Sequence, residues 1–286
     1  MKKMSLLLIA VLMFLIGIAS FSYPFLASWL YQQSALQVQV EYKEKISEIS
    51  QEELDGMLEE VKDYNQALLN SGVILTDPFD EEQIDIDDMY MKLLTESSEM
   101  GYVTIPSLEV TLPIYHTTSD EVLALGAGHM MYTSIPIGGN STHAVISAHS
   151  GLPNAEMFTN LSSMKIGEVF NIDILGQLLT YQVYDIETVL PDEVESLAIQ
   201  QDKDLVTLVT CTPLGVNSHR LLVHGTRVEE SEVEDLLEEK PEIDSKLTYI
   251  NYVVYAAVIS SVIFILLLIL VLISQHKFRK KKLSKK

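Results

Sequence analysis

The chain of 286 residues contains a single cysteine, Cys211. One cysteine excludes an intramolecular disulfide, so this thiol is either free or paired with another molecule. The sequence also lacks the HExxH, CxxC and EF-hand patterns that are typical of metal sites. We therefore expect no metal and no cofactor.

Charged residues are absent from positions 4–40, and positions 5–22 are almost continuously apolar behind two lysines. This pattern is typical of a signal peptide or of an uncleaved signal anchor. Small residues in the segment could supply a cleavage site, but the apolar character continues as far as Leu30, which favours a retained anchor. We assign residues 1–30 to this segment.

A second apolar segment, residues 252–273, has no charged residue and is followed by the basic sequence HKFRKKKLSKK. Its length and composition predict a transmembrane helix over 250–274 and a basic tail over 275–286. Lysine and arginine mark the cytoplasmic side of a membrane. We therefore expect both termini to be cytoplasmic, the N-terminus if it is uncleaved, and residues 41–248 to lie outside the cell.

Basic residues are scarce in this exported stretch, which holds all 40 acidic residues and only ten of the 19 lysines and arginines. The difference is a formal charge of −30. Such a surface is a poor candidate for binding nucleic acid, whose phosphates require basic side chains. A solvated surface that keeps an exported domain soluble explains the acidity better than a recognition face does. The acidic residues continue into a predicted connector over 231–249.

Residues 37–70 carry apolar or aromatic side chains every three to five positions, with Glu and Lys between them. This spacing predicts one or two amphipathic helices. Gly72 and Pro78 then interrupt the pattern. We assign residues 31–98 to a helical appendage in front of the main domain.

From residue 99 to residue 230 the composition indicates β-structure. Short runs rich in Val, Ile, Thr and Tyr alternate with Gly, Pro, Asn and Asp, which is typical of a mainly-β barrel or sandwich. Two short helices are expected within this region, near 120–125 and 155–164. The runs are GYVTIPSLEVTLPIYH, THAVISAH, EVFNIDILG, LLTYQVYDIETVL, LVTLVTC and RLLVHGTRVE.

Cys211 ends one of these runs, and two interpretations of it compete. A lone cysteine at a strand end is often a small buried hydrophobe. As a nucleophile it would need a nearby base or cation. Of six exported histidines, His149 is the best placed, because its strand leads directly into a loop, where catalytic groups are common. His219, next to Arg220, competes for the same role. The others are His116, His129, His143 and His224.

The run TLVTC, followed by TPLGVNSHRLLV, resembles the cysteine and arginine strands of the sortases, membrane-anchored cysteine transpeptidases of Gram-positive bacteria. The resemblance extends over residues 102–228 and includes GAGHM and SIPIGGNSTHAVISAHSGLPNAEMF. It implies a closed β-barrel with short helices. It also implies that Cys211 is the nucleophile, His149 the acid and base, and Arg220 the cation that positions the substrate and stabilises the oxyanion.

Two further features resemble the class C sortases, which polymerise pilins. One is the second transmembrane segment, and the other is TDPFDE, which matches a lid motif at Asp77, Pro78 and Phe79. A helix start with Asp77 as its N-cap is a second interpretation of this motif. The chain departs from the class around the histidine: it has Ala-His-Ser-Gly at 148–151, where many members have Gly-His-Arg-Gly.

The resemblance implies cleavage of an LPxTG-like sorting signal between Thr and Gly through a thioacyl enzyme. A pilin lysine amine would then accept the acyl group, so the partners would be LPxTG-bearing pilins or surface proteins. Transfer to a cell-wall precursor, as in housekeeping sortases, is the nearest alternative, and hydrolysis by water is another. A membrane-tethered binding or scaffold module is a candidate from a different class, but it leaves the order of the histidine, thiol and arginine strands unexplained.

Overall fold

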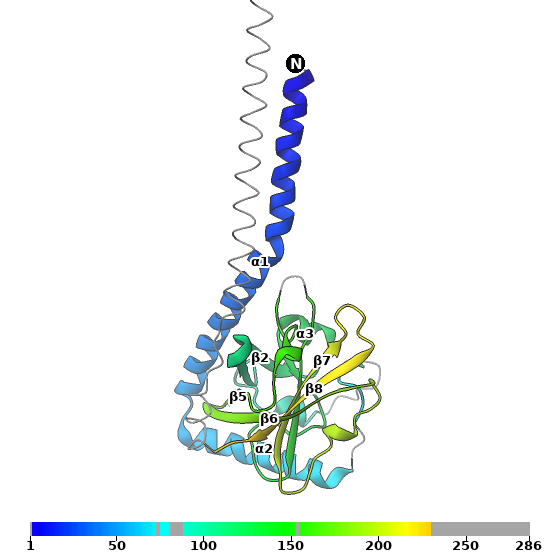
Figure 1. Ribbon diagram of the computed structural model, residues 1–286. Helices are drawn as coiled ribbons and strands as arrows, with labels where there is room; N and C mark the ends of the chain where they lie inside the picture. The colour runs from blue at the N-terminus through cyan, green and yellow to red at the C-terminus, as the bar shows by residue number, and fades with distance from the viewer. Residues whose placement is uncertain (1, 73–74, 81–87, 153–154, 230–286) are drawn as a thin grey trace, which may run out of the picture. The chain divides into compact units, whose positions relative to one another are not determined.

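In the computed structural model, the N-terminal helices are followed by a domain of short β-strands (Figure 1). The structure describes residues 2–72, 75–80, 88–152 and 155–229. The connector, the second transmembrane helix and the basic tail that the sequence predicts all lie outside these residues.

Eight strands within the described residues close into a barrel in the order β1-β2-β3-β4-β7-β8-β6-β5. The pairs β2–β3 and β4–β7 are parallel, whereas the other neighbours are antiparallel. Closure pairs every strand on both sides and so removes exposed sheet edges. The predicted mainly-β barrel is confirmed. The strands are β1 Gly101–Ile105, β2 Val110–His116, β3 Ala127–His129, β4 Thr142–Ser147, β5 Val169–Ile174, β6 Gln177–Val189, β7 Asp204–Thr212 and β8 His219–Arg227.

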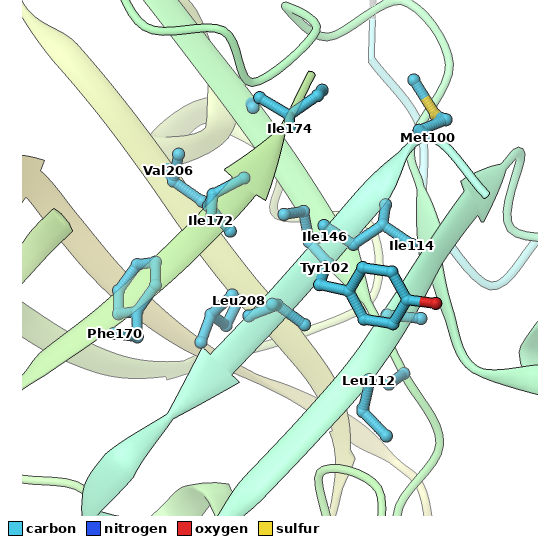
Figure 2. Close-up of a cluster of buried hydrophobic side chains, with 14 of the residues drawn as sticks. Met100, Tyr102, Leu112, Ile114, Ile146, Phe170, Ile172, Ile174, Val206 and Leu208 are labelled. Atoms are coloured by element: carbon cyan, nitrogen blue, oxygen red, sulfur yellow. The ribbon is translucent and has the colours of Figure 1, made fainter. Parts of the chain in front are cut away.

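Side chains that alternate along the strands fill the barrel, as expected for a period of two. Figure 2 shows Phe170, Ile172 and Ile174 of β5 beside Val206 and Leu208 of β7. All five are almost completely buried. Burying an aliphatic or aromatic side chain of this size contributes roughly 1.5–3 kcal/mol, so this interior is the main source of stability.

Two helices precede the barrel, which confirms the helical prediction for residues 37–70. Helix α1, Lys2–Glu48, includes the apolar N-terminal segment and is the one helix among the described residues long and apolar enough to cross a membrane. Helix α2, Gln51–Ser71, begins with a capping box between Ser50 and Glu53 and ends at Gly72 in the left-handed conformation. The capping box explains why a new helix starts after Ser50, and Gly72 explains where this helix ends.

Both helices are tied to the barrel by buried polar side chains. The Tyr42 hydroxyl of α1 donates to the Met100 carbonyl at 3.0 Å and accepts from the Leu175 amide at 2.9 Å. In α2, the Asn65 side chain donates to the Ile135 carbonyl at 3.0 Å and accepts from the Ile135 amide at 2.8 Å. These hydrogen bonds fix the positions of α1 and α2 against the barrel.

The short helices only partly match the sequence predictions. Helix α3, Asp120–Leu125, has the predicted bounds and is capped by Ser119. The prediction of a helix over 155–164 is wrong. The only helical element in this range is the 3-10 turn η4, Leu161–Ser163. Met157 has a φ of 42°, which an α-helix does not accommodate. The other 3-10 turns are η2 Tyr90–Lys92, η3 Pro106–Leu108 and η5 Glu195–Leu197.

Strand β3 was not predicted, since three residues are too few to show an alternating pattern. Its central residue, Gly128, lies directly against the backbone of the segment at Thr117. A Cβ atom at this position would stand 2.2 Å from the carbonyl oxygen of Thr117. Only glycine lets the two backbones approach so closely.

We expect Gly225→Ala to lower the free energy of unfolding by roughly 1–3 kcal/mol, the usual cost of overpacking. A Cβ atom there would stand 2.5 Å from two ring atoms of Phe170 and 3.0 Å from Cβ of Tyr181, whose rings are stacked. Gly56→Ala is the matched control: the position is exposed in α2 with nothing within 4 Å. It should raise stability by up to about 1 kcal/mol. Denaturant unfolding measures both changes, and equal stability of the two variants would contradict the packing.

Candidate active site

Cys211 and Arg220 lie directly opposite each other on β7 and β8. Residues paired in this way project from the same face of a sheet, with Cβ atoms about 4.5–5.5 Å apart. The alternation shows which face it is: Leu208 points into the barrel, whereas Val209 and Leu222 belong to a separate apolar cluster outside it. The thiol and the guanidinium therefore share the outer face of the barrel.

The segment that carries His149 runs alongside Cys211 on the opposite side of β7. Strand β4 pairs with β7 in parallel as far as Ser147 and Val209. Extending this register by two residues brings His149 level with Cys211. The bond from the Ala148 amide to the Val209 carbonyl, 3.1 Å long, continues the ladder in this direction. The three predicted residues thus come from three adjacent segments of the barrel wall.

His219 occupies a different position from His149. It pairs with Thr212, one residue beyond Cys211 in the ladder, so its side chain projects from the other face of the sheet. Its Nδ1 lies 2.9 Å from the Ser218 hydroxyl. Three other histidines, His129, His143 and His224, are buried in hydrogen-bond networks inside or along the barrel wall. His143 and His224 share the outer face but lie level with Leu205 and Thr207, several residues along β7 from Cys211. His149 is therefore the histidine that the structure brings level with Cys211 on this face.

The predicted lid residues contact this same group. Asp77 accepts hydrogen bonds from Nε and Nη2 of Arg220, at 2.9 and 2.5 Å, and the two side chains are only 13% and 11% exposed. The Phe79 ring lies 5.0 Å below the Arg220 guanidinium carbon and 6.4 Å from the His149 ring. A bidentate pair so shielded from water is stronger than an ordinary surface ion pair.

The Asp-Pro-Phe segment itself forms a turn. Asp77 accepts from the Phe79 amide through its side chain and from the Asp80 amide through its carbonyl, at 3.3 and 3.0 Å. Pro78 is buried. The alternative prediction of a helix start is not seen over 77–80, and its continuation falls on residues outside the described ranges. The carboxylate of Asp77 caps a turn and holds Arg220 at once.

One lid residue had not been singled out from the sequence. Leu75 packs with Phe79 on the outer apolar cluster, which we define as Met130, Val145, Leu197, Val209 and Leu222. An isolated leucine in a loop carries no sequence signal, so only the packing reveals it. The lid therefore binds through two apolar side chains and one ion pair.

Comparison with known proteins assigns this arrangement to a family. A family model described as the sortase domain matches residues 103–228. The crystal structure of Streptococcus agalactiae sortase C1 in complex with MTSET is 40% identical with a TM-score of 0.60, and the match covers 65% of this chain and 94% of that chain. The chain belongs to the sortase family.

Other sortases support the same assignment. Streptococcus pneumoniae sortase C is 39% identical with a TM-score of 0.64, over 68% of this chain and 97% of that chain. Actinomyces oris sortase C-1 is 43% identical with a TM-score of 0.59, over 62% and 99%. A curated relative, Sortase A of Streptococcus agalactiae, is 32% identical over 129 residues, which are 44% of this chain and 51% of that protein. The match therefore spans about half the length of this curated relative.

The Asp-Pro-Phe segment also affects the ionisation of the Cys211 thiol. Burial raises the pKa of Cys211 above its ordinary value, and the negative charge of Asp77 raises it further. The positive charge of Arg220 lowers it, but not enough to offset the other two effects. A covered thiol is therefore held in its protonated, less nucleophilic form.

We expect the double variant Asp77→Ala, Phe79→Ala to lower the pKa of Cys211, because it removes a carboxylate whose charge raises that pKa and leaves Arg220 in place. Below both pKa values the thiolate fraction then rises about tenfold for each unit by which the pKa falls. Because a less basic thiolate is also less nucleophilic, the alkylation rate should rise about threefold for each unit. Rates measured with a neutral thiol reagent across a pH series test this. Asp63→Ala, an exposed change in α2, is the control. Identical profiles for wild type and the lid variant would contradict a role of the lid at the thiol.

Proposed function

We propose that this chain is a class C sortase that cleaves an LPxTG-like sorting signal between Thr and Gly and joins the new carboxyl end to a pilin lysine. Cys211 is the nucleophile, His149 the general acid and base, and Arg220 the donor to the developing oxyanion. The observation that carries the proposal is the pairing of Cys211 with Arg220 on one face of the barrel, with the His149 segment alongside.

The reaction has two acyl transfers. The Cys211 thiolate attacks the Thr carbonyl carbon, and the tetrahedral intermediate expels the glycine amine, which takes a proton from His149. A thioester to Cys211 remains. A lysine amine then attacks the thioester carbonyl and gives up a proton to His149, and the sulfur leaves as a thiolate. The product is an isopeptide bond, and the enzyme returns to its starting state.

Arg220 has the donors that this chemistry needs. Its Nη1 group donates to the carbonyl oxygens of Asn217 and His219, at 3.1 and 3.2 Å, which fixes the guanidinium plane within its own loop. The Nε and Nη2 edge is occupied by Asp77. When the lid leaves, this edge is available to a carbonyl oxygen that becomes negatively charged in the transition state.

The lid also indicates where a substrate would lie. Leu75 and Phe79 cover the outer apolar cluster, so an incoming peptide has to replace apolar side chains as well as a carboxylate. The Leu and Pro of a sorting signal are suited to such a surface. Binding of the signal and opening of the lid are therefore competing events, and the lid has to be held by only a few kcal/mol.

The relatives fall into two groups, which support two different acceptors for the acyl group. Among the solved relatives, sortase C of Group B Streptococcus is pilus-related, and sortase C of Streptococcus pneumoniae is described with pilin substrate specificity, which supports a pilin lysine. The curated relatives are sortases A, which keeps the amine of a wall precursor as the second candidate. Incubating the enzyme and a sorting-signal peptide with both acceptors, and identifying the adduct by mass spectrometry, decides between them.

The apolar half of α1 is compatible with an anchor in the membrane. We propose that the barrel lies outside the cell and that both ends of the chain are cytoplasmic. The basic tail that supports this orientation lies outside the described residues. The strongly acidic exported surface is consistent with a solvated enzyme and excludes no peptide substrate.

We expect Cys211→Ala to abolish polymer formation and to leave thermal stability close to that of the wild type, because the change removes the nucleophile and little volume. Covalent pilin ladders on denaturing gels, in a strain without other sortases, measure the activity, and thermal melts check the fold. Ladders that persist with Cys211→Ala would refute the assignment of Cys211 as the nucleophile.

We expect His149→Ala and Arg220→Ala each to reduce kcat/KM for a sorting-signal peptide at least about a hundredfold, the usual loss for a general acid–base or an oxyanion donor. Arg220→Lys should not restore activity, since a point charge does not reproduce a planar fork of donors. The matched control His219→Ala should have a much smaller effect. An essential His219 with a dispensable His149 would reverse the assignment.

A further inference from the structure

Ser150 follows His149 in the chain, and its hydroxyl donates a hydrogen bond of 2.7 Å to the carbonyl oxygen of Cys211. This bond joins the residue after the proposed general acid to the backbone of the proposed nucleophile. The two residues are 61 positions apart in the sequence. Their connection is independent of the lid, of Arg220 and of the side chains of His149 and Cys211.

The register of the sheet explains why a hydroxyl stands at this place. In the ladder between β4 and β7, the Thr142 amide bonds to the Lys203 carbonyl at 3.0 Å and the Ala148 amide to the Val209 carbonyl at 3.1 Å. In a parallel ladder every second residue repeats this pattern. The next donor would be the amide of Ser150, and its acceptor would be the Cys211 carbonyl.

Strand β4 has ended by this point, because the chain bends at Ser150 and Gly151, and Gly151 has a φ of 77°. The Ser150 hydroxyl supplies the bond to Cys211 that a continued strand would have supplied with its amide. The chain can therefore turn away after His149 and still remain attached to β7. Without the hydroxyl, the Cys211 carbonyl loses this donor.

Other bonds hold the same turn but do not reach Cys211. Thr210 donates from its hydroxyl to the Ala148 carbonyl at 2.7 Å. The Phe158 amide donates to the His149 carbonyl at 3.1 Å. The Gly151 amide donates to the Thr159 hydroxyl at 2.9 Å. Of these hydrogen bonds, the one from Ser150 is the bond whose acceptor is the carbonyl group of Cys211.

We propose that Ser150 is a positioning residue that sets the placement of His149 relative to Cys211, an inference that rests on the proposed function. The hydroxyl touches neither the sulfur nor the substrate and acts by holding the two backbones in register. Its loss should let the His149 turn shift against β7. A displacement of about 1 Å between reacting groups can cost up to a hundredfold in rate.

The experiment compares Ser150→Ala, which removes the donor, with Ser150→Thr, which keeps a hydroxyl, in the full-length protein. Thr159→Val is the matched control, because it removes another hydroxyl from the same turn and leaves the bond to Cys211 intact. The first readout is kcat and KM for a sorting-signal peptide. We expect Ser150→Ala to lower kcat about tenfold with KM nearly unchanged, and Ser150→Thr to retain most of the activity.

The second readout is the pH profile of Cys211 alkylation by a neutral reagent, which requires no sorting signal. Profiles of the wild type and of His149→Ala give the two references, one with the imidazole and one without it. The Ser150→Ala profile should move toward that of His149→Ala, whereas the Thr159→Val profile should match the wild type. If the wild type cleaves no sorting signal, the proposed function fails, but the alkylation profiles still test the positioning.

Three results would overturn the inference. They are wild-type kcat and a wild-type alkylation profile for Ser150→Ala, an equal loss of kcat for Thr159→Val, and a Ser150→Thr variant as impaired as Ser150→Ala although its melting temperature is unchanged. The last result would mean that the size of the side chain, rather than its hydroxyl, matters at this position.

Discussion

The position of β7 between a parallel and an antiparallel neighbour is the constraint on which the candidate site depends. Because β4 runs parallel to β7, the ends of both strands meet at the same edge of the barrel. Because β8 runs antiparallel, its first residues meet that edge as well. His149, Cys211 and Arg220 are brought together by these two pairings. A slip of one residue in either ladder would turn a functional side chain to the other face.

In the proposed mechanism, Arg220 serves both the reaction and the closed lid. One edge of its guanidinium is fixed by carbonyl groups of its own loop, while the other is bound by Asp77. The outer apolar cluster, with Phe79 packed on it, shields the Arg220 pair from water and so strengthens its electrostatic interaction. The same shielding that stabilises the closed lid would strengthen donation to an oxyanion once the lid is open. Both proposed functions, oxyanion stabilisation and lid binding, depend on a cation that lies beside apolar side chains.

Local sequence patterns failed where tertiary contacts determine the backbone. The segment before η4 has a composition that suits a helix, but the Phe158 amide bonds to the His149 carbonyl instead of to a helical partner. Strand β3 is too short to show a period, and its glycine reflects contact with Thr117. In each case the deciding contact lies far away in the sequence or outside the local pattern.

The sequence by itself determined the mainly-β class, most of the strands, a helical segment before them and a short list of chemically suitable residues, and the resemblance added the closed barrel. Those features depend on apolar periodicity, on capping residues and on the presence of a single thiol, all of which are local or compositional. Only the tertiary structure decided that His149 rather than His219 shares the face of Cys211, that Asp77 holds Arg220, and that Ser150 bonds to the nucleophile's backbone. These choices join residues 61 to 143 positions apart. They depend on the register between strands, which packing of the whole barrel sets and which no local pattern encodes.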